Sequence, residues 1–449
     1  MDKSIACFLI LLSLTTVFLI TIQPARASSK TTVVPDDYST IGGAIGNASQ
    51  GDTIFVKKGT YHENLVISKS LSLIGEDKVT TIIDGSGKGT VVQINSNNSV
   101  LSGFTVQKSG NNFTDSGIYL NYSSNTSILG NLVTNNNIGM YLYESRNTIL
   151  RNNNMSHNSY NFGVYASSLE GYIQNIDTSN SMDGKPLIYW VNQANKQSPS
   201  DAGYVAIVNS TNIIVEDSTL ERNWQTALFA YTKNSTIRNA TATLGMDSIW
   251  LLDCSNCSIY GNNVSDNIWG GIALVNSFRC SVYGNTIRGN GGYGTLLSYS
   301  SDNTVYHNDF IDNPRQAWLY GFNNNTWDNG YPSGGNYWSD YNGTDARSGP
   351  HQDEKGSDKI GDTGYVIDSN NVDRYPLMKP WNLQPSEAKP INIVLYAIAG
   401  IGAAIIASSV TIYLMKVRKQ LSKVKMLEPV NLKGKAGTGS SLNQDKDGP

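Results

Sequence analysis

Thr126-Ser-Ile-Leu-Gly-Asn131, Asn147-Thr-Ile-Leu-Arg-Asn152, Cys257-Ser-Ile-Tyr-Gly-Asn262, Cys280-Ser-Val-Tyr-Gly-Asn285 and Asn303-Thr-Val-Tyr-His-Asn308 are copies of one short motif. Their aliphatic positions recur at steps of 22 or 23 residues, as in Ile214, Ile237, Ile259, Val282 and Val305. Ile128 and Ile149 extend the series toward the N-terminus. A repeat of this length is typical of a solenoid, in which one residue of each turn points the same way and stacks on the next.

Each repeat contains three short alternating runs separated by turns rich in Asn, Gly and Ser. In one unit the runs are Ser258-Ile-Tyr, a second around Val264, and Gly271-Ile-Ala-Leu. Three strands per turn predict an all-β, right-handed parallel β-helix. Asparagine suits the corners because it tolerates the left-handed conformation, and its amide can form a ladder with the turns above and below.

The repeat divides the chain into segments. We expect an N-terminal cap and first turns over residues 29–89, because an open solenoid end exposes strand edges. Repeats follow over residues 90–338, interrupted at 177–203, where we expect a loop or odd turns that carry binding residues. An acidic C-terminal cap region, residues 339–381, and a linker, residues 382–390, follow.

Both ends of the chain carry apolar segments. Residues 1–28 contain Lys3, a long apolar run and Ala25-Arg-Ala27, which predict a signal peptide, with an uncleaved anchor as the alternative. Residues 391–415 are 25 residues without charge, long enough for a transmembrane helix. The basic residues at the start of the tail, residues 416–449, predict a type I protein in the cell membrane whose repeats lie outside the cytoplasm. Thirteen Asn-x-Ser/Thr sequons between the apolar segments are candidate glycan sites.

The charge of the chain argues against one class of partner. Only 15% of the residues are charged and the formal net charge is −3. No run of Lys and Arg is interleaved with aromatic residues, so we expect no binding of nucleic acid.

The insertion Gly184-Lys-Pro-Leu-Ile-Tyr-Trp190, the phrase Gly334-Gly-Asn-Tyr-Trp-Ser-Asp-Tyr341 and the repeats together resemble archaeal cell-surface members of the NosD family of β-helix repeats. These repeats are also described as carbohydrate-binding and sugar-hydrolysis repeats. The resemblance covers roughly residues 35–380. It implies the β-helix fold, but the fold alone does not choose among lyases, epimerases, adhesins and copper-accessory proteins.

Two residue clusters suggest metal or redox chemistry. Asp353, Asp358 and Asp362 lie in a Gly-rich acidic segment, which suits calcium, with a solvated acidic loop as the alternative. Cys257 and Cys280 occupy the same position in successive turns, about 4.8 Å apart, which favours a disulfide. Cys254 completes a thiol cluster, but His62, His157, His307 and His351 are too scattered to complete a copper or zinc site.

Aromatic residues recur near equivalent points of successive turns. We expect five of them to form a stacking platform for sugar rings: Trp224, Tyr231, Trp250, Trp269 and Trp318. The alternative is that they are buried inside the coil. No set of acidic and basic residues identifies a catalytic centre. The sequence therefore favours a membrane-anchored protein that binds a polysaccharide or cell-envelope glycan without catalysis. A polysaccharide lyase or epimerase and a NosD-like copper-accessory protein are the alternatives.

Overall fold

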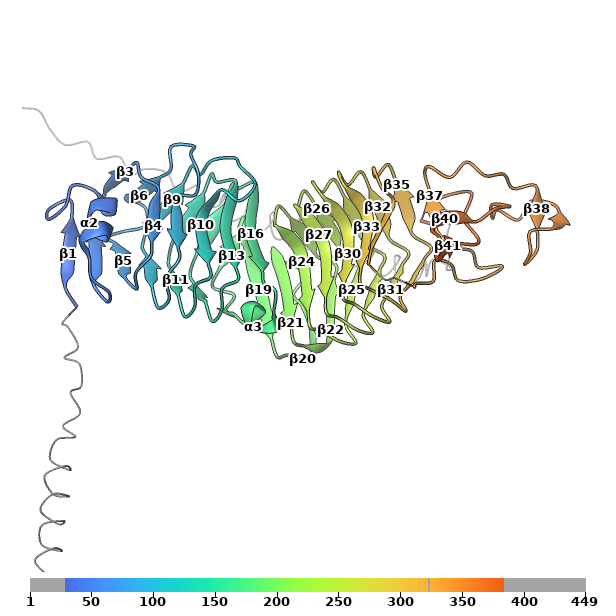
Figure 1. Ribbon diagram of the computed structural model, residues 1–449, viewed down its shortest axis with the longest axis horizontal. Coiled ribbons are helices and arrows are strands. Elements are labelled where there is room, and N and C mark those ends of the chain that lie inside the picture. The colour runs from blue at the N-terminus through green and yellow to red at the C-terminus, as the bar shows by residue number, and fades with distance from the viewer. Residues whose placement is uncertain (1–28, 322–323, 383–449) are drawn as a thin grey trace, which may run out of the picture. The chain divides into compact units, whose positions relative to one another are not determined.

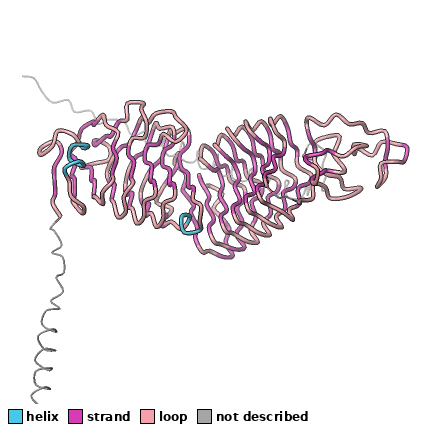
Figure 2. Tube along the Cα trace, viewed as in Figure 1, coloured by secondary structure: helices cyan, strands magenta, loops and turns pink. Residues whose placement is uncertain are grey.

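A computed structural model describes residues 29–321 and 324–382 of the chain. These residues form a parallel β-solenoid, as predicted, with nearly all strands short and stacked side by side (Figures 1 and 2). The solenoid has two parts, which we name the first coil (β1–β18) and the second coil (β19–β37). The signal peptide, the transmembrane helix and the cytoplasmic tail that we predict lie outside the described residues. Among the described ones, no helix is long and apolar enough to span a membrane.

Three sheets form the walls of the first coil. Sheet A contains β1 Thr31–Val34, β2 Thr53–Val56, β5 Ser72–Gly75, β8 Val100–Ser102, β11 Ser127–Leu129, β14 Ile149–Arg151 and β17 Asn175–Ile176. Sheet B begins with β3 Gly59–Tyr61, β6 Thr81–Asp84, β9 Thr105–Gln107, β12 Leu132–Thr134, β15 Asn154–Ser156 and β18 Ser181–Met182. Sheet C contains β4 Leu65–Ile67, β7 Val92–Ile94, β10 Ser116–Asn121, β13 Ile138–Tyr143 and β16 Tyr160–Tyr165.

Sheet B continues into the second coil, where two new sheets accompany it. Its later strands are β19 Lys185–Val191, β21 Tyr204–Val208, β24 Gln225–Ala230, β27 Asp247–Leu252, β30 Gly270–Val275, β33 Tyr293–Ser298 and β36 Ala317–Tyr320. Sheet D contains β20 Ala194–Gln197, β22 Thr211–Glu216, β25 Thr236–Arg238, β28 Ser258–Tyr260, β31 Ser281–Tyr283 and β34 Thr304–Tyr306. Sheet E contains β23 Thr219–Glu221, β26 Thr241–Thr243, β29 Asn263–Ser265, β32 Thr286–Arg288, β35 Asp309–Ile311 and β37 Tyr337–Trp338.

The aliphatic stack that we predict exists, with a correction of one residue at two places. Ile237, Ile259, Val282 and Val305 pair in register and are buried. Val215, not Ile214, pairs with Ile237. In the first coil Leu150, not Ile149, pairs with Ile128. Because side chains alternate across a strand, a slip of one residue moves a side chain from the core to the outer face.

Asparagine ladders run inside the turns, as predicted. Asn262 Nδ2 donates to Asn285 Oδ1 at 2.9 Å, and Asn285 Nδ2 donates to Asn308 Oδ1 at 2.8 Å. Asn308 Nδ2 donates in turn to Asn336 Oδ1 at 2.9 Å. Each of these four side chains is almost fully buried, so the ladder satisfies amides that would otherwise be costly to bury.

The stretch 177–203 joins the two coils and forms strands rather than a projecting loop. β18 pairs with β19 antiparallel, unlike the neighbouring strands of sheet B. The outer side of β19, β21 and β24 then packs against the end of the first coil, where Tyr204 meets Phe162 edge-on at 5.2 Å. Asn161 N also donates to Arg222 O, and Trp224 N donates to Phe162 O. One hydrophobic cluster therefore crosses from the first coil into the second.

Two short helices and a small C-terminal region complete the described part. In helix α2 (Ile41–Asn47), Ile41 N and Gly42 N donate to the Glu63 carboxylate at 2.9 and 2.8 Å. Helix α3 (Leu169–Tyr172) follows β16. After β37 come two antiparallel pairs, β38 (Arg347–Ser348) with β39 (Glu354–Lys355) and β40 (Tyr365–Asp368) with β41 (Asn371–Asp373).

Candidate functional site

The five aromatic residues of the predicted platform lie in different environments. Trp250 and Trp318 belong to one register column on the outer side of sheet B, separated by Ala273 and Leu296, and both are half-buried. Trp269 is 48% exposed at the turn before β30. Tyr231 packs against the end of the first coil, and Trp224 is only 6% exposed. The structure therefore does not join the five into a single platform.

A carboxyl group lies on the same outer side of sheet B. Tyr293 Oη donates to Asp247 Oδ1 at 3.0 Å, and its ring crosses the intervening Gly270, where a Cβ would lie 2.1 Å from Tyr293 Cζ. Burial raises the pKa of Asp247 to about 7, although the Tyr293 hydroxyl partly opposes this shift. Burial also raises the pKa of Tyr293. The Asp247 carboxyl therefore titrates near neutral pH rather than near pH 4.

A larger aromatic surface covers the outer side of sheet C. We name this surface, made of Tyr119, Tyr122, Tyr141, Tyr143 and Tyr165, the tyrosine face. The rings of Tyr119 and Tyr141 stack at 5.7 Å and 9°, and those of Tyr143 and Tyr165 stack at 5.6 Å and 10°. Tyr122 meets Tyr143 edge-on at 5.6 Å. Tyr122 and Tyr165 are 65% and 37% exposed, so flat ring surface is available to a ligand.

Trp224 closes one end of the tyrosine face. Its ring lies 4.9 Å from that of Tyr141 and 4.8 Å from that of the exposed Phe113. Gly163, the residue in register with Tyr141 on β16, makes room for Trp224, because a Cβ there would lie 2.5 Å from Trp224 Cβ. The tryptophan of the second coil is therefore a wall for the aromatic surface of the first.

Amide side chains extend the tyrosine face toward the N-terminus. Gln93 precedes Tyr119 in the same register column, and Gln93 Nε2 donates to Asn95 Oδ1 at 2.9 Å. Asn121 Nδ2 donates to the same oxygen at 3.2 Å, and Asn121 precedes Tyr143 in its column. Rings and amides thus follow one another at the spacing of the strands, which places stacking surfaces beside hydrogen-bonding groups.

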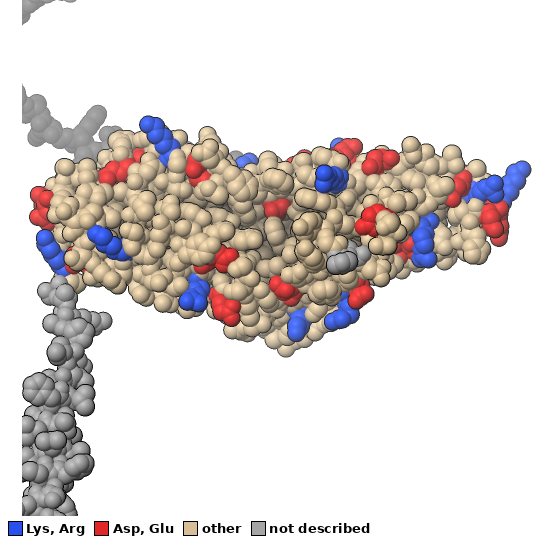
Figure 3. Space-filling view, viewed as in Figure 1, with Lys and Arg blue, Asp and Glu red and all other residues tan. Residues whose placement is uncertain are grey.

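A hollow of about 400 Å³ adjoins this end of the face. Gln93 and Tyr119 line it together with Val66, Lys88 and Asp115. Its two charged side chains have opposite signs. Figure 3 likewise shows mostly uncharged atoms in its view of the molecule, with small groups of Lys, Arg, Asp and Glu of both signs between them. The hollow and the face therefore suit an uncharged ligand better than a highly charged one.

Two of the three acidic residues that we predict to bind calcium accept hydrogen bonds from backbone amides. Asp362 accepts bonds from Ala346 N and Arg347 N, and Asp358 accepts one from Ile360 N at 3.0 Å. Within residues 29–321 and 324–382, no group of three or more His, Cys, Asp or Glu side chains is placed to hold a metal ion. Calcium binding by Asp353, Asp358 and Asp362 stays a prediction.

The predicted disulfide does not form: Cys254, Cys257 and Cys280 are free thiols in the core. Cys257 and Cys280 directly precede the paired residues Ser258 and Ser281. In-register neighbours have parallel Cα–Cβ bonds, so their Cβ atoms lie about 4.8 Å apart, beyond the roughly 4.5 Å limit for a disulfide. The prediction considered only the Cα separation.

The same thiols do not fit a copper site. The Cys254 thiol and burial raise the pKa of Cys257 to about 12, and the Cys257 thiol and burial raise the pKa of Cys280 further. Cys254 Sγ donates to the backbone carbonyl of Phe229. Metals bind thiolates, and the raised pKa values of Cys257 and Cys280 make their thiolate forms costly, which disfavours a copper site here.

The sequence contained a signal for the tyrosine face that the prediction missed. Tyr119 and Tyr141, and likewise Tyr143 and Tyr165, are each separated by 22 residues, which is the period of the repeat. Tyr141-Leu-Tyr143 also alternates as an outward-facing pair does. The prediction weighted tryptophan and so concentrated on the second coil.

Several solved structures are similar to this chain. The A-module of mannuronan C-5 epimerase AlgE6 from Azotobacter vinelandii is 16% identical, with 64% of this chain and 90% of that chain covered and a TM-score of 0.30. An alginate lyase from Paenibacillus is 13% identical, with 66% and 99% covered and a TM-score of 0.30. DFA-IIIase from Arthrobacter chlorophenolicus is 11% identical, with 69% and 94% covered and a TM-score of 0.35. These values are too low to transfer a substrate or an activity.

No curated protein sequence matches the chain. The profile of one protein family, described as "Periplasmic copper-binding protein (NosD)", matches residues 45–184 and 160–343. The matched region contains most of both coils, including the tyrosine face and the junction between them. This chain therefore belongs to the NosD family.

Proposed function

We propose that the protein is a cell-surface solenoid that binds carbohydrate through the tyrosine face without catalysis. The observation that carries this proposal is the pair of parallel ring stacks, Tyr119 with Tyr141 and Tyr143 with Tyr165, in which Tyr165 is exposed and Tyr119 is half-buried. Sugar rings present C–H groups that pack on flat aromatic surfaces and hydroxyls that bond amides. Gln93, Asn95 and Asn121 supply such amides beside the rings.

The ionisation of the phenols supports an uncharged ligand. Burial raises the pKa of Tyr119, and the neighbouring Tyr143 raises that of Tyr122. These hydroxyls are therefore neutral at physiological pH and both donate and accept hydrogen bonds. A neutral polysaccharide or envelope glycan matches this surface.

The experiment is a titration of the full-length protein, in lipid nanodiscs without sugar-based detergent, against an array of neutral glycans. Tyr165→Ala and Tyr119→Ala should each weaken binding about tenfold, the loss of roughly 1.4 kcal/mol of stacking. Tyr299→Ala is the control, because Tyr299 is 49% exposed on the second coil and lies outside the tyrosine face. Equal binding by all four proteins would overturn the proposal.

The proposal includes the placement of the solenoid at the cell surface. The apolar segment 391–415, followed by basic residues, supports a single C-terminal membrane helix, and residues 1–28 support export. Helix α2, held by Glu63, supports a cap over the first turns. Protease protection in membrane vesicles would test the topology: only the tail after residue 415 should be accessible from the cytoplasmic side.

One observation favours an enzyme as a second candidate. Asp247 has a pKa near 7, is oriented by Tyr293 and lies on the side of sheet B that also carries Trp250, which is how general acids are often placed. A polysaccharide lyase would produce new unsaturated ends after incubation with glycans, and an epimerase would change the ratio of the two epimers in the polymer, which NMR measures. Turnover that Asp247→Asn abolishes would replace the binding proposal with this one.

A further inference from the structure

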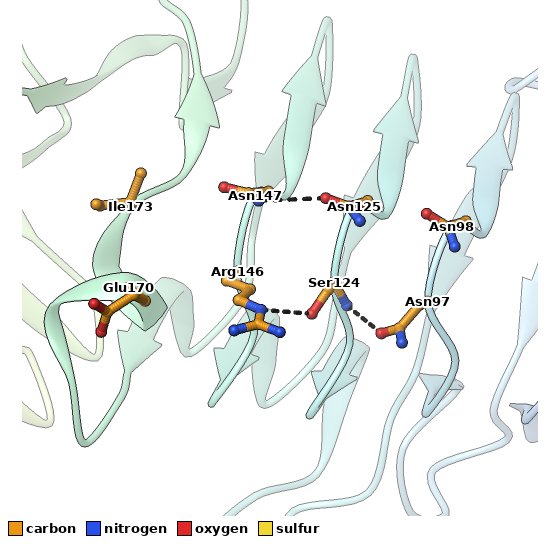
Figure 4. A pocket seen from close by; sticks show the side chains of 8 residues that line it. All are labelled: Asn97, Asn98, Ser124, Asn125, Arg146, Asn147, Glu170 and Ile173. Carbon is orange, nitrogen blue, oxygen red and sulfur yellow. Dashed lines mark hydrogen bonds between the residues drawn. The ribbon is translucent and has the colours of Figure 1, made fainter.

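A polar groove lies around the corner of the first coil from the tyrosine face. It has a volume of about 370 Å³ and is lined by Asn97, Asn98, Ser124, Asn125, Arg146, Asn147, Glu170 and Ile173. We name it the amide groove. Only Glu144 and Ser145 separate Tyr143 of the tyrosine face from Arg146 of the groove. Figure 4 shows three successive rungs of polar side chains, with Glu170 and Ile173 beside the last of them.

Each rung comes from one turn of the solenoid, and bonds between rungs fix the side chains. Asn97 Oδ1 accepts from Ser124 N at 2.8 Å, and Arg146 Nε donates to Ser124 Oγ at 3.2 Å. Asn147 Nδ2 donates to Asn125 Oδ1 at 3.3 Å. The corner residues Asn98, Asn125 and Asn147 have φ of 55°, 55° and 51°, the left-handed region that asparagine tolerates.

These bonds leave a set of donors and acceptors directed to solvent. Among the described residues, no partner bonds the two terminal nitrogens of Arg146, the Asn97 and Asn125 Nδ2 groups or Asn147 Oδ1. Asn97, Asn125, Arg146 and Asn147 are all exposed. The positions of these side chains are thus set by the scaffold while part of their hydrogen-bonding capacity remains available to a ligand.

Helix α3 ends the series of rungs. Asn147 N donates to Ile173 O at 3.0 Å, so the turn after the Arg146 rung presents Ile173 and the preceding helix in place of another amide. The Glu170 carboxylate accepts bonds from its own amide and from Ser168, which together with Arg146 lower its pKa, so it is charged at neutral pH. An extended ligand that lies along the rungs therefore ends at helix α3.

The lining decides the class of ligand. The charges of Arg146 and Glu170 cancel, although the two side chains form no ion pair within 4 Å. The remaining lining side chains are amides, one hydroxyl and one isoleucine. The lining contains no aromatic ring, which distinguishes the groove from the tyrosine face. Vicinal hydroxyls, each both donor and acceptor, match this mixture of fixed donors and acceptors, whereas an acyl chain or a polyanion does not.

We propose that the amide groove binds the terminal unit of an uncharged saccharide chain, with Arg146 as hydroxyl donor and Glu170 as hydroxyl acceptor. The inference shares the class of ligand with the proposed function but uses different residues. It adds recognition of the end of a saccharide chain to recognition along the length of that saccharide.

The test is calorimetric titration of the full-length protein in nanodiscs with four neutral hexasaccharides, of β-1,4-glucan, α-1,4-glucan, β-1,4-mannan and β-1,4-xylan, and with hexagalacturonate. At least one neutral probe should bind, and Arg146→Gln and Glu170→Gln should each raise its Kd about tenfold or more. Arg279→Gln is the matched control, because Arg279 is an exposed corner residue of the second coil whose Nε likewise donates to a polar side chain of the preceding turn, Asn256. The long polymer of the same backbone should bind one protein per chain rather than many.

The outcomes separate this inference from the proposed function. Loss of binding in Arg146→Gln and Glu170→Gln alone supports the groove, whereas loss in Tyr165→Ala alone supports only the tyrosine face and overturns the groove. Tighter binding of hexagalacturonate, binding of many proteins per polymer chain, or no binding by any probe would each overturn the inference.

Discussion

Single asparagines determine whether the turns of this solenoid stack. Asn285 is fully buried, donates to Asn308 and to the carbonyls of Ile259 and Tyr283, and accepts from Asn262. Asn285→Ala leaves several of these buried groups without a partner, which should lower the free energy of unfolding by about 2–4 kcal/mol. Urea denaturation followed by far-UV circular dichroism measures the loss.

Asn256→Ala is the control for this ladder prediction. Asn256 also belongs to an asparagine pair, with Asn234, but is exposed, so its removal should change stability by less than about 0.5 kcal/mol. A similar loss in both variants would show that the ladder stabilises the fold no more than a surface contact does.

A second residue makes stability depend on pH. Burial raises the pKa of Asp247 from 3.8 to about 7 in the folded protein. The folded state therefore holds this proton more tightly than the unfolded state, and its contribution to stability falls as the pH rises from about 4 to about 7. Asp247→Asn keeps an acceptor for Tyr293 and removes the titration. The unfolding free energy of the variant, relative to that of the wild type, should therefore rise by about 2–3 kcal/mol between pH 5 and pH 8.

This gain is measured as the difference in unfolding free energy between variant and wild type at the two pH values, which cancels other titrating groups. Asn263→Ala, which removes no ionisable group from an exposed site on β29, serves as the reference and should show no such change with pH. A difference that stays constant from pH 5 to pH 8 would contradict the assignment of a raised pKa to Asp247.

At the scale of strands, the period of the sequence predicted the solenoid but left its register open by one residue. Ile214 and Val215 are both aliphatic, as are Ile149 and Leu150, so hydrophobicity alone cannot decide which of them faces the core. Because the turns stack in register, outward-facing residues one repeat apart form a column on the surface. The 22-residue spacing within the tyrosine face could therefore have identified it from the sequence. The broken period located the junction at residues 177–203 but did not predict its strands, because β18 and β19 pair between residues that the period does not relate.

The last described residues, 379–382, are held to the second coil by a few contacts. The Trp381 ring stacks on His307 at 3.5 Å and 8°, and Trp381 N and Asn382 N donate to the Asp309 carboxylate. Trp381→Ala removes about 1 kcal/mol of ring stacking and should release this segment locally. Hydrogen exchange at residues 379–382 should accelerate severalfold while the melting temperature changes by less than about 2 °C.

Trp269→Ala provides the comparison for the Trp381 prediction, because Trp269 is 48% exposed and lies on another turn. It should leave hydrogen exchange at residues 379–382 unchanged. If Trp381→Ala instead lowers the stability of the whole coil, the segment is an integral part of the solenoid rather than a strap laid on it.

For the whole molecule, the junction decides whether two stacked coils behave as one folding unit. Repeat proteins gain stability from contacts between neighbours, so a weak interface lets segments unfold separately. Here the core of the first coil continues into β19, β21 and β24, and the tyrosine face ends on Trp224 of the second coil. We therefore expect the two coils to melt in one transition.

Gly163→Ala should make the two coils unfold separately. The added Cβ would lie 2.5 Å from Trp224 Cβ and 3.0 Å from Tyr141 Cδ2, so β16 and β24 must separate, at a cost of about 1–3 kcal/mol. Differential scanning calorimetry should then resolve two transitions, with Trp224 becoming more exposed in the first. Gly46→Ala is the control, because no atom lies within 4 Å of a Cβ at that position in α2 and alanine favours the helix. A single transition in Gly163→Ala would mean that the covalent link through β18 and β19, rather than the packing of Trp224, couples the two coils.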